Sequence, residues 1–137
     1  MTAELPRYAN EGDACVDLVG QKRWEDKWGN KCFDTGLAVE IPTGFVGLIF
    51  PRSSISKTDM MLRNCVGVID SGYRGPLIVK FKAHDKTKTG TARNYHYMEG
   101  DRIAQLMIIP CPQIEFVEVD ELSDSDRGSG GFGSTGT

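Results

Sequence analysis

Apolar and polar residues alternate along much of this chain, which is the pattern of β-strands with one buried face. Leu77, Val79 and Phe81 share one predicted face, and Lys80 and Lys82 share the other. Gly and Pro interrupt the pattern repeatedly, and helical periodicity is almost absent. Further strands are predicted at 37–41, 45–50, 103–109 and 114–119. Short strands separated by turns predict a compact all-β barrel or sandwich.

One short helix is predicted directly after Pro51 and Arg52. Ser53 or Ser54 is expected to cap a turn of helix that runs toward Leu62. An arginine, two hydroxyls and free backbone N–H groups at a helix start are suited to bind phosphate. Plain helix capping explains the same residues, so this segment alone supports both interpretations.

Two polar stretches, 21–31 and 85–94, are predicted as excursions on the surface. The first is rich in charge and contains Trp24 and Trp28. These tryptophans either form a surface for a protein partner or anchor a long loop onto the body of the molecule.

The composition is that of a soluble globular protein with one domain: 137 residues, 39% hydrophobic and 26% charged. The net charge of -3 has the wrong sign for general nucleic-acid binding, so no such binding is expected. No apolar run approaches the roughly 20 residues that cross a bilayer. The N-terminus lacks the pattern of a secretory signal, so a cytoplasmic location without membrane contact is expected.

The four cysteines show no CxxC spacing, and the chain has only two histidines, so no structural metal site is predicted. Cys65 and Cys111 stand beside strand-like apolar residues and are predicted to be small core residues. All four thiols are expected to be free in a reducing compartment.

The C-terminus changes character after an acidic stretch. Five of the last eleven residues, RGSGGFGSTGT, are glycine, so this segment cannot hold a packed conformation alone. A domain at 1–122 and a flexible arm at 123–137 are therefore predicted. Arg127, Phe132, Ser134 and Thr135 would suit a lid over a flat anionic ligand, and a disordered tail fits the composition equally well.

Three further positions are candidates for chemistry. Asp70 stands at a predicted hairpin tip, where it acts as a base near Tyr73 or accepts backbone N–H bonds in an Asx-type turn. Gln105 lies among apolar residues and needs a partner, either structural or a ligand. Asp17 stands at the edge of an apolar stretch, where a salt bridge to an arginine is expected.

Together these segments resemble the trimeric dUTPase family in five places and in the family's order. The five motifs are ACVDL, PRSS, the stretch around GVIDSGYRG, GDRIAQL and RGSGGFGSTG, at 14–18, 51–54, 64–75, 100–106 and 127–136. The resemblance spans nearly the whole chain. One such motif arises easily by chance, whereas five in order do not.

The resemblance implies a jelly-roll-like subunit of the β-clip kind, assembled as a homotrimer with active sites at subunit interfaces. It implies a dUTP diphosphatase, which hydrolyses dUTP to dUMP and pyrophosphate by in-line attack of water on the α-phosphate. Such an enzyme limits uracil incorporation into DNA and supplies dUMP for thymidylate synthesis. Asp70, Gln105 and Arg127 take the catalytic positions. The implied substrate-binding residues are Arg52, Ser53, Ser54, Asn64, Gly67, Val68, Ile69, Tyr73, Lys80, Phe132, Gly133, Ser134 and Thr135.

Individual roles follow from the same resemblance. Asp70 holds the 3′-hydroxyl and orients or deprotonates the attacking water, and Tyr73 packs under the deoxyribose and leaves no room for a 2′-hydroxyl. Phe132 stacks on uracil while Arg127 helps to close the arm over the phosphates. Mg²⁺ is the expected cofactor, held by phosphate oxygens and water without a direct protein ligand, with an indirect role for Asp17.

Two other functions fit parts of the sequence. A dCTP deaminase shares the implied fold and would release ammonia from dCTP. A regulatory protein could use dUTP as a switch and the loop with Trp24 and Trp28 as its contact surface, with or without catalysis.

Overall fold

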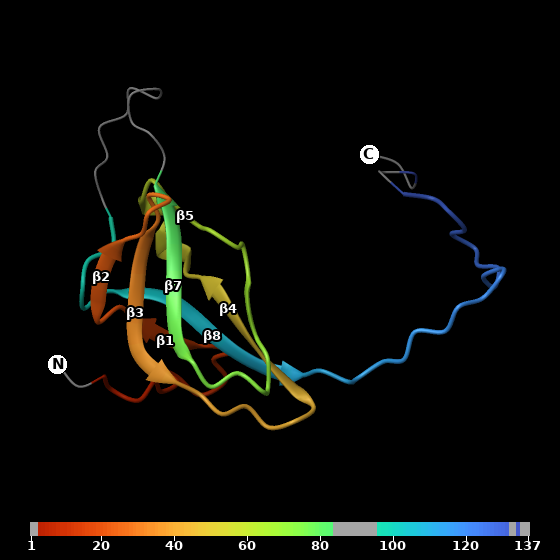
Figure 1. Ribbon diagram of the computed structural model, residues 1–137, viewed down its shortest axis with the longest axis horizontal. Coiled ribbons are helices and arrows are strands. Elements are labelled where there is room, and N and C mark those ends of the chain that lie inside the picture. Colours follow the sequence, from red (N-terminus) through yellow and green to blue (C-terminus); the bar gives the residue numbers. More distant parts are fainter. Residues whose placement is uncertain (1–2, 84–95, 132–133, 135–137) are drawn as a thin grey trace.

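A computed structural model describes residues 3–83, 96–131 and 134, and their strands form two antiparallel sheets of four strands each (Figure 1). In order across the first sheet, the strands are β1 (Val16–Val19), β8 (Arg102–Pro110), β4 (Phe45–Pro51) and β6 (Gly67–Ile69). In order across the second sheet, they are β2 (Lys22–Glu25), β3 (Lys31–Ala38), β7 (Pro76–Ala83) and β5 (Met60–Leu62). The predicted all-β sandwich is confirmed.

The core lies between the two sheets, where alternate residues of their strands meet. Leu77, Val79 and Phe81 of β7 are buried, as their alternation with polar residues predicts. Phe81 packs edge-on against Phe33 of β3, with 5.9 Å between the ring centroids. From the first sheet, Ile103 of β8 is fully buried in the same cluster.

Part of the stretch at 21–31 is a strand and not a surface excursion, so that prediction is wrong in part. Lys22–Glu25 pairs with Lys31–Asp34 as a β-hairpin, because Trp24 and its neighbours find partners along β3. Gly29 closes the connecting turn with a φ of +73°, which L side chains rarely adopt. The other predicted excursion, 85–94, lies outside the described residues.

The predicted helix is a short 3₁₀ segment, η1 (Ser53–Lys57), which ends well before Leu62. Arg52 is its N-cap residue, and no side chain caps it, so the predicted serine cap is wrong. The chain then leaves η1 extended and enters β5, because Met60 and Leu62 are buried as strand residues. No helix in the described part of the chain is long and apolar enough to cross a membrane.

The segment from β6 to β7 passes from one sheet to the other. β6 pairs with β4, whereas β7 pairs with β3 and β5, so the predicted hairpin has a tight turn but no shared ladder. The amide of Tyr73 donates to the carbonyl of Asp70 at 3.0 Å, which places Ser71 and Gly72 in the centre of that turn. β6 and β7 therefore enter different sheets on either side of this turn.

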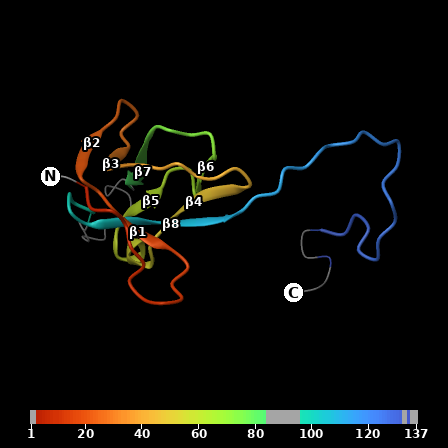
Figure 2. The same ribbon diagram turned by 90° about the horizontal axis from the view of Figure 1, so that it is seen from below.

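After β8 the chain leads away from the sandwich (Figure 2). The strand predicted at 114–119 is not formed: Ile114 and Phe116 are 72% and 90% exposed. Within the described residues, no strand pairs with this part of the chain. Cys65 is also exposed and Cys111 is half-buried, so the prediction that both are core residues is wrong.

Candidate active site

A cluster of charge lies where β1, β8 and the end of β4 come together. The Asp17 carboxylate accepts hydrogen bonds from Nε of Arg52 at 2.6 Å and from Nη1 of Arg102 at 3.2 Å. The predicted salt bridge of Asp17 to an arginine is thus observed. One carboxylate compensates two guanidinium groups, so the cluster as a whole favours an anion.

Two further polar side chains near the charge cluster, Gln105 and Ser54, make hydrogen bonds to a backbone carbonyl and to a hydroxyl group. Gln105 of β8 donates its side-chain amide to the carbonyl of Pro51 at 3.0 Å, so a structural contact is present, and the contact with a ligand stays a prediction. Ser54 shares a 2.9 Å hydrogen bond with the hydroxyl of Tyr97. Arg52, Ser53 and Ser54 therefore start η1 beside the charge cluster, as a phosphate site requires.

A pocket of about 290 Å³ lies between β6 and β7, where these strands diverge. Its lining combines apolar side chains, the end of β5 and two cations. The lining residues are Ile49, Leu62, Arg63, Asn64, Gly67, Val68, Ile69, Ile78, Val79 and Lys80. Five of the predicted substrate-binding residues are thus brought together. An apolar pocket with a few polar groups at its wall suits a small flat ligand.

Asp70 stands next to this pocket, at the start of the turn that follows β6. Its side chain is exposed, and among the described residues no hydrogen bond occupies its carboxylate. The turn is closed by a backbone bond, so the Asx-type alternative is not observed. Tyr73 is 41% exposed, and its hydroxyl donates to the carbonyl of Pro76 at 3.0 Å, which fixes the ring beside the turn.

The charge cluster and the pocket lie at different levels of the sandwich. Asp70 follows Ile69, which pairs with Gly47 near the start of β4, whereas Arg52 follows the last residue of β4. At about 3.3 Å per strand residue, roughly 20 Å separates the levels of Asp70 and Arg52. The structure therefore brings Gln105 close to Arg52 but does not bring Asp70 and Arg52 into one site within a single chain.

The arm does not reach either group in this structure. Nε of Arg127 donates to the carbonyl of Gly130 at 2.9 Å, a contact within the arm itself. Ser134 is exposed. The other predicted arm residues, Phe132, Gly133 and Thr135, lie outside the described residues.

Two residues with important contacts were missed in the sequence. Arg102 shares Asp17 with Arg52, and Asp26 binds Lys80 across the second sheet at 3.3 Å. Arg102 stands inside the GDRIAQL motif, so its charge was a usable signal. Asp26 had none, because the pairing depends on how the β2–β3 turn folds over β7.

A large hollow of about 1100 Å³ lies beside the charge cluster and is lined by the N-terminal segment and β1. Asp17 and Arg102 line it together with Leu5, Arg7 and Thr35. Within 3–83, 96–131 and 134, no group of three or more carboxylates, thiols or imidazoles gathers as metal ligands would.

Comparison with known proteins gives one consistent result. The dUTPase family model matches residues 1–136. The deoxyuridine 5′-triphosphate nucleotidohydrolase of Thermobifida fusca is 43% identical over 134 residues, which is 96% of this chain and 72% of that protein. The enzyme of the same name from Crocosphaera subtropica is 39% identical over 136 residues, covering 98% of this chain and 92% of that protein.

Solved structures agree. A mutant dUTPase of Staphylococcus bacteriophage 80alpha with dUpNHpp has a TM-score of 0.79 at 29% identity, covering 99% of this chain and 94% of that one. A mutant dUTPase of phage phi11 of S. aureus has a TM-score of 0.71 at 29% identity, covering 88% and 92%. That phage structure is described as showing the coordination of a structural Mg(II) ion.

The fold is a small β-sandwich with a cluster of guanidinium groups around Asp17 near one end and a small, largely apolar pocket between β6 and β7. The chain belongs to the dUTPase family. The predicted family, fold class and enzyme class are confirmed. The roles of individual residues stay predictions.

Proposed function

We propose that the chain hydrolyses dUTP to dUMP and pyrophosphate by attack of water on the α-phosphate. The observation that supports this most directly is that the chain has two complementary binding features. One is a small apolar pocket beside the exposed carboxylate of Asp70, and the other is a separate cluster of guanidinium and hydroxyl groups. A nucleoside triphosphate has the matching parts, since its base is flat and its other end is a polyanion. The uracil preference rests on the family membership.

The pocket would take the base through backbone groups. β6 pairs with β4 along one edge only, and Gly67, Val68 and Ile69 line the pocket on its other side. An unpaired strand edge presents alternating N–H and C=O groups, which match a base with both acceptors and donors. Asn64 at the pocket wall adds one amide that donates and accepts. The Tyr73 ring beside the turn would pack under the sugar.

The carboxylate of Asp70 would orient the attacking water and accept its proton. It is exposed and uncommitted to any described hydrogen bond, so it is free to do this. Gln105 and Arg127 would stabilise charge that develops at the phosphorus. Displacement at phosphorus depends mainly on positioning and charge neutralisation, so no protein nucleophile is required.

Arg52, Ser53 and Ser54 would hold the phosphate chain, and Ser134, Thr135 and Phe132 of the arm would close over it. Magnesium bound to phosphate oxygens would supply further charge neutralisation. The donor set fits this arrangement, because both oxygens of Asp17 already accept from arginines and leave an indirect role only.

A homotrimer would complete the site. Because roughly 20 Å of strand separates Asp70 from Arg52 in one chain, the two meet only if different subunits supply them. The exposed apolar side chains after β8, Ile114, Phe116, Val117 and Leu122, also require a neighbour to bury them. A symmetric ring of identical chains satisfies both conditions.

The test is release of pyrophosphate in the presence of Mg²⁺, with dUTP compared with dTTP, dCTP and UTP. Cleavage of dUTP alone is expected, since the pocket selects the base and Tyr73 the sugar. Ammonia release from dCTP would support a deaminase, and folded protein that cleaves none of the four would leave only nucleotide binding. The hypothesis that Trp24 and Trp28 bind a protein partner stays a prediction.

A further inference from the structure

The side chain of Tyr97 lies in the core, and its hydroxyl reaches the start of η1. Only 2% of Tyr97 is exposed, and its ring packs against Phe81 of β7 with 5.5 Å between the ring centroids. Its Oη lies 2.9 Å from Oγ of Ser54. Ser54 is one of the two serines that would hold phosphate at this end of the sandwich. A buried phenol thus contacts a proposed substrate-binding group directly.

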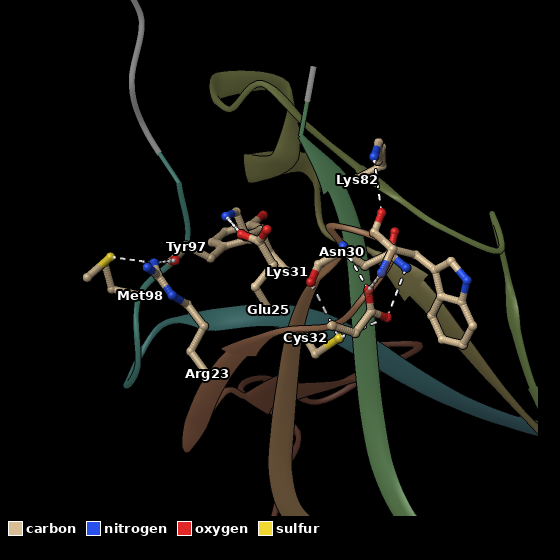
Figure 3. Close-up of polar contacts among 10 residues, drawn as sticks. Arg23, Glu25, Asn30, Lys31, Cys32, Lys82, Tyr97 and Met98 are labelled. Atoms are coloured by element: carbon tan, nitrogen blue, oxygen red, sulfur yellow. Dashed lines mark hydrogen bonds and ion pairs between the residues drawn. The ribbon is translucent and has the colours of Figure 1, made fainter. Parts of the chain in front are cut away.

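The backbone of Tyr97 is bound on the side away from η1. Nη1 of Arg23 on β2 donates to the carbonyl of Tyr97 at 3.4 Å and contacts Sδ of Met98 at 3.2 Å (Figure 3). The backbone N–H of Met98 donates to Oδ2 of Asp101 at 2.7 Å. Because its ring is packed and its backbone is bound, Tyr97 presents its hydroxyl to Ser54 from a defined position.

The hydrogen bond between these two hydroxyls has a preferred direction. In the part of the chain that the structure describes, Ser54 is the one polar partner of the Tyr97 hydroxyl. If Ser54 were the donor, the phenol proton would be buried without an acceptor, which costs free energy. Ser54 is only half-buried, so its own proton can reach water or a ligand. Tyr97 is therefore the donor, and the Ser54 proton points away from it.

We propose that Tyr97 is a positioning residue for phosphate binding, because it donates to Ser54 and so leaves the Ser54 proton for the substrate. This rests on the proposed function, in which Ser54 holds the phosphate chain. Ionised phosphate oxygens only accept hydrogen bonds, so a serine must present its proton to bind them. Ser54 is thus oriented before the substrate arrives, and no side chain has to be reoriented on binding.

The principal variant is Tyr97→Phe, which keeps the ring against Phe81 and removes only the hydroxyl. In the presence of Mg²⁺, the Kd of the non-hydrolysable analogue dUpNHpp should rise about fivefold to tenfold, the size of one oriented hydrogen bond to a charged group. The Kd of deoxyuridine, which has no phosphate, should stay that of the wild type. The KM for dUTP should rise by a similar factor with kcat unchanged, because Ser54 would bind phosphate in the ground state and the transition state alike.

A double-mutant cycle tests whether Tyr97 acts through Ser54. Ser54→Ala should weaken dUpNHpp at least as much as Tyr97→Phe does. Adding Tyr97→Phe to Ser54→Ala should then have no further effect, because the hydroxyl that Tyr97 positions is gone. If the effects of the two substitutions simply multiply, Tyr97 does not act through Ser54 and the proposal is overturned.

Thr35→Val is the matched control. Thr35 on β3 is 1% exposed, and its hydroxyl donates to the carbonyl of Leu77 at 2.9 Å. This variant also loses one buried hydroxyl bond, so its urea midpoint should fall about as much as that of Tyr97→Phe. Its Kd values for dUpNHpp and deoxyuridine should stay those of the wild type. Equal weakening of both ligands by Tyr97→Phe would show general damage to the site and overturn the proposal.

The two proposals fail in different ways. If the wild type binds dUpNHpp no more tightly than deoxyuridine and cleaves no dUTP, the proposed function is wrong and the role of Tyr97 falls with it. If the wild type cleaves dUTP and Tyr97→Phe keeps the full affinity for dUpNHpp, only the role of Tyr97 is wrong.

Discussion

Asp70 is the residue on which the proposed reaction depends most. In Asp70→Asn the shape of the turn should persist, since its closing bond runs from the Tyr73 amide to the backbone of residue 70. The charge that orients the water is lost, so kcat for dUTP should fall about a hundredfold to ten-thousandfold while nucleotide binding stays. Steady-state kinetics and calorimetry with a non-hydrolysable analogue measure the two effects.

Asp13→Asn is the control for this substitution. Asp13 is another exposed turn aspartate, and in the described part of the chain its carboxylate accepts hydrogen bonds from Asn10 alone. Its replacement should leave turnover as in the wild type. If Asp70→Asn turns over as fast as Asp13→Asn, the base in this reaction is a different group.

At the same scale, the residues show what the sequence can and cannot specify. The sequence predicts that Asp17 pairs with an arginine, because a charged residue at the edge of an apolar strand needs an opposite charge. That the carboxylate serves Arg102 as well as Arg52 depends on the register of β1 on β8. The pair of Asp26 and Lys80 joins positions far apart in the chain, so only the folded sheet reveals it.

Among the elements, the β2–β3 hairpin couples stability to pH through Asp26. The pKa of Asp26 lies well below its usual value, chiefly because the Asn30 side chain donates to it and also through Lys80 and two backbone N–H groups, against partial desolvation. In the unfolded chain, an Asp side chain has a pKa of about 4. Because the pKa of Asp26 is lower in the folded than in the unfolded protein, its ionised carboxylate stabilises the fold fully above the unfolded pKa. This stabilisation is lost as the pH falls from the unfolded pKa toward the folded one.

Asp26→Asn should therefore unfold at lower urea concentration than wild type at about pH 7 and lose less stability on going to about pH 3. Urea midpoints at both pH values measure this difference. Glu25→Gln is the control in the same hairpin, because Glu25 pairs with Lys31 while 53% exposed, and exposed pairs contribute little. Parallel loss of stability with pH in wild type and Asp26→Asn would contradict the role of Asp26.

The elements also separate what periodicity predicts from what it misses. β4, β7 and β8 have strong apolar patterns, and they occur where the pattern places them. β2 was missed because its four residues are all exposed, so no buried face marks it in the sequence. The segment at 114–119 has a strand pattern without a strand, because no strand in the described part of the chain lies beside it to pair with it.

For the whole molecule, the distance between Asp70 and Arg52 leads to a strict expectation about assembly. If each site takes Arg52 from one subunit and Asp70 from its neighbour, then Arg52→Ala and Asp70→Asn homotrimers each lack one essential group in all three sites. In a mixed trimer, some sites join an intact Arg52 to an intact Asp70. Two inactive proteins should therefore regain activity when their subunits exchange.

Co-expression of the two variants with different affinity tags, followed by tandem purification, isolates the mixed trimers. In each mixed trimer one of the three sites joins an intact Arg52 to an intact Asp70, so about a third of the sites should be intact. Activity of this order is expected from the mixed species and none from either parent. A double variant carrying both changes on one chain, mixed with wild type, controls for simple dilution. If the mixed trimers stay inactive, Arg52 and Asp70 must act within one chain, and the chain must then rearrange to close the distance between them.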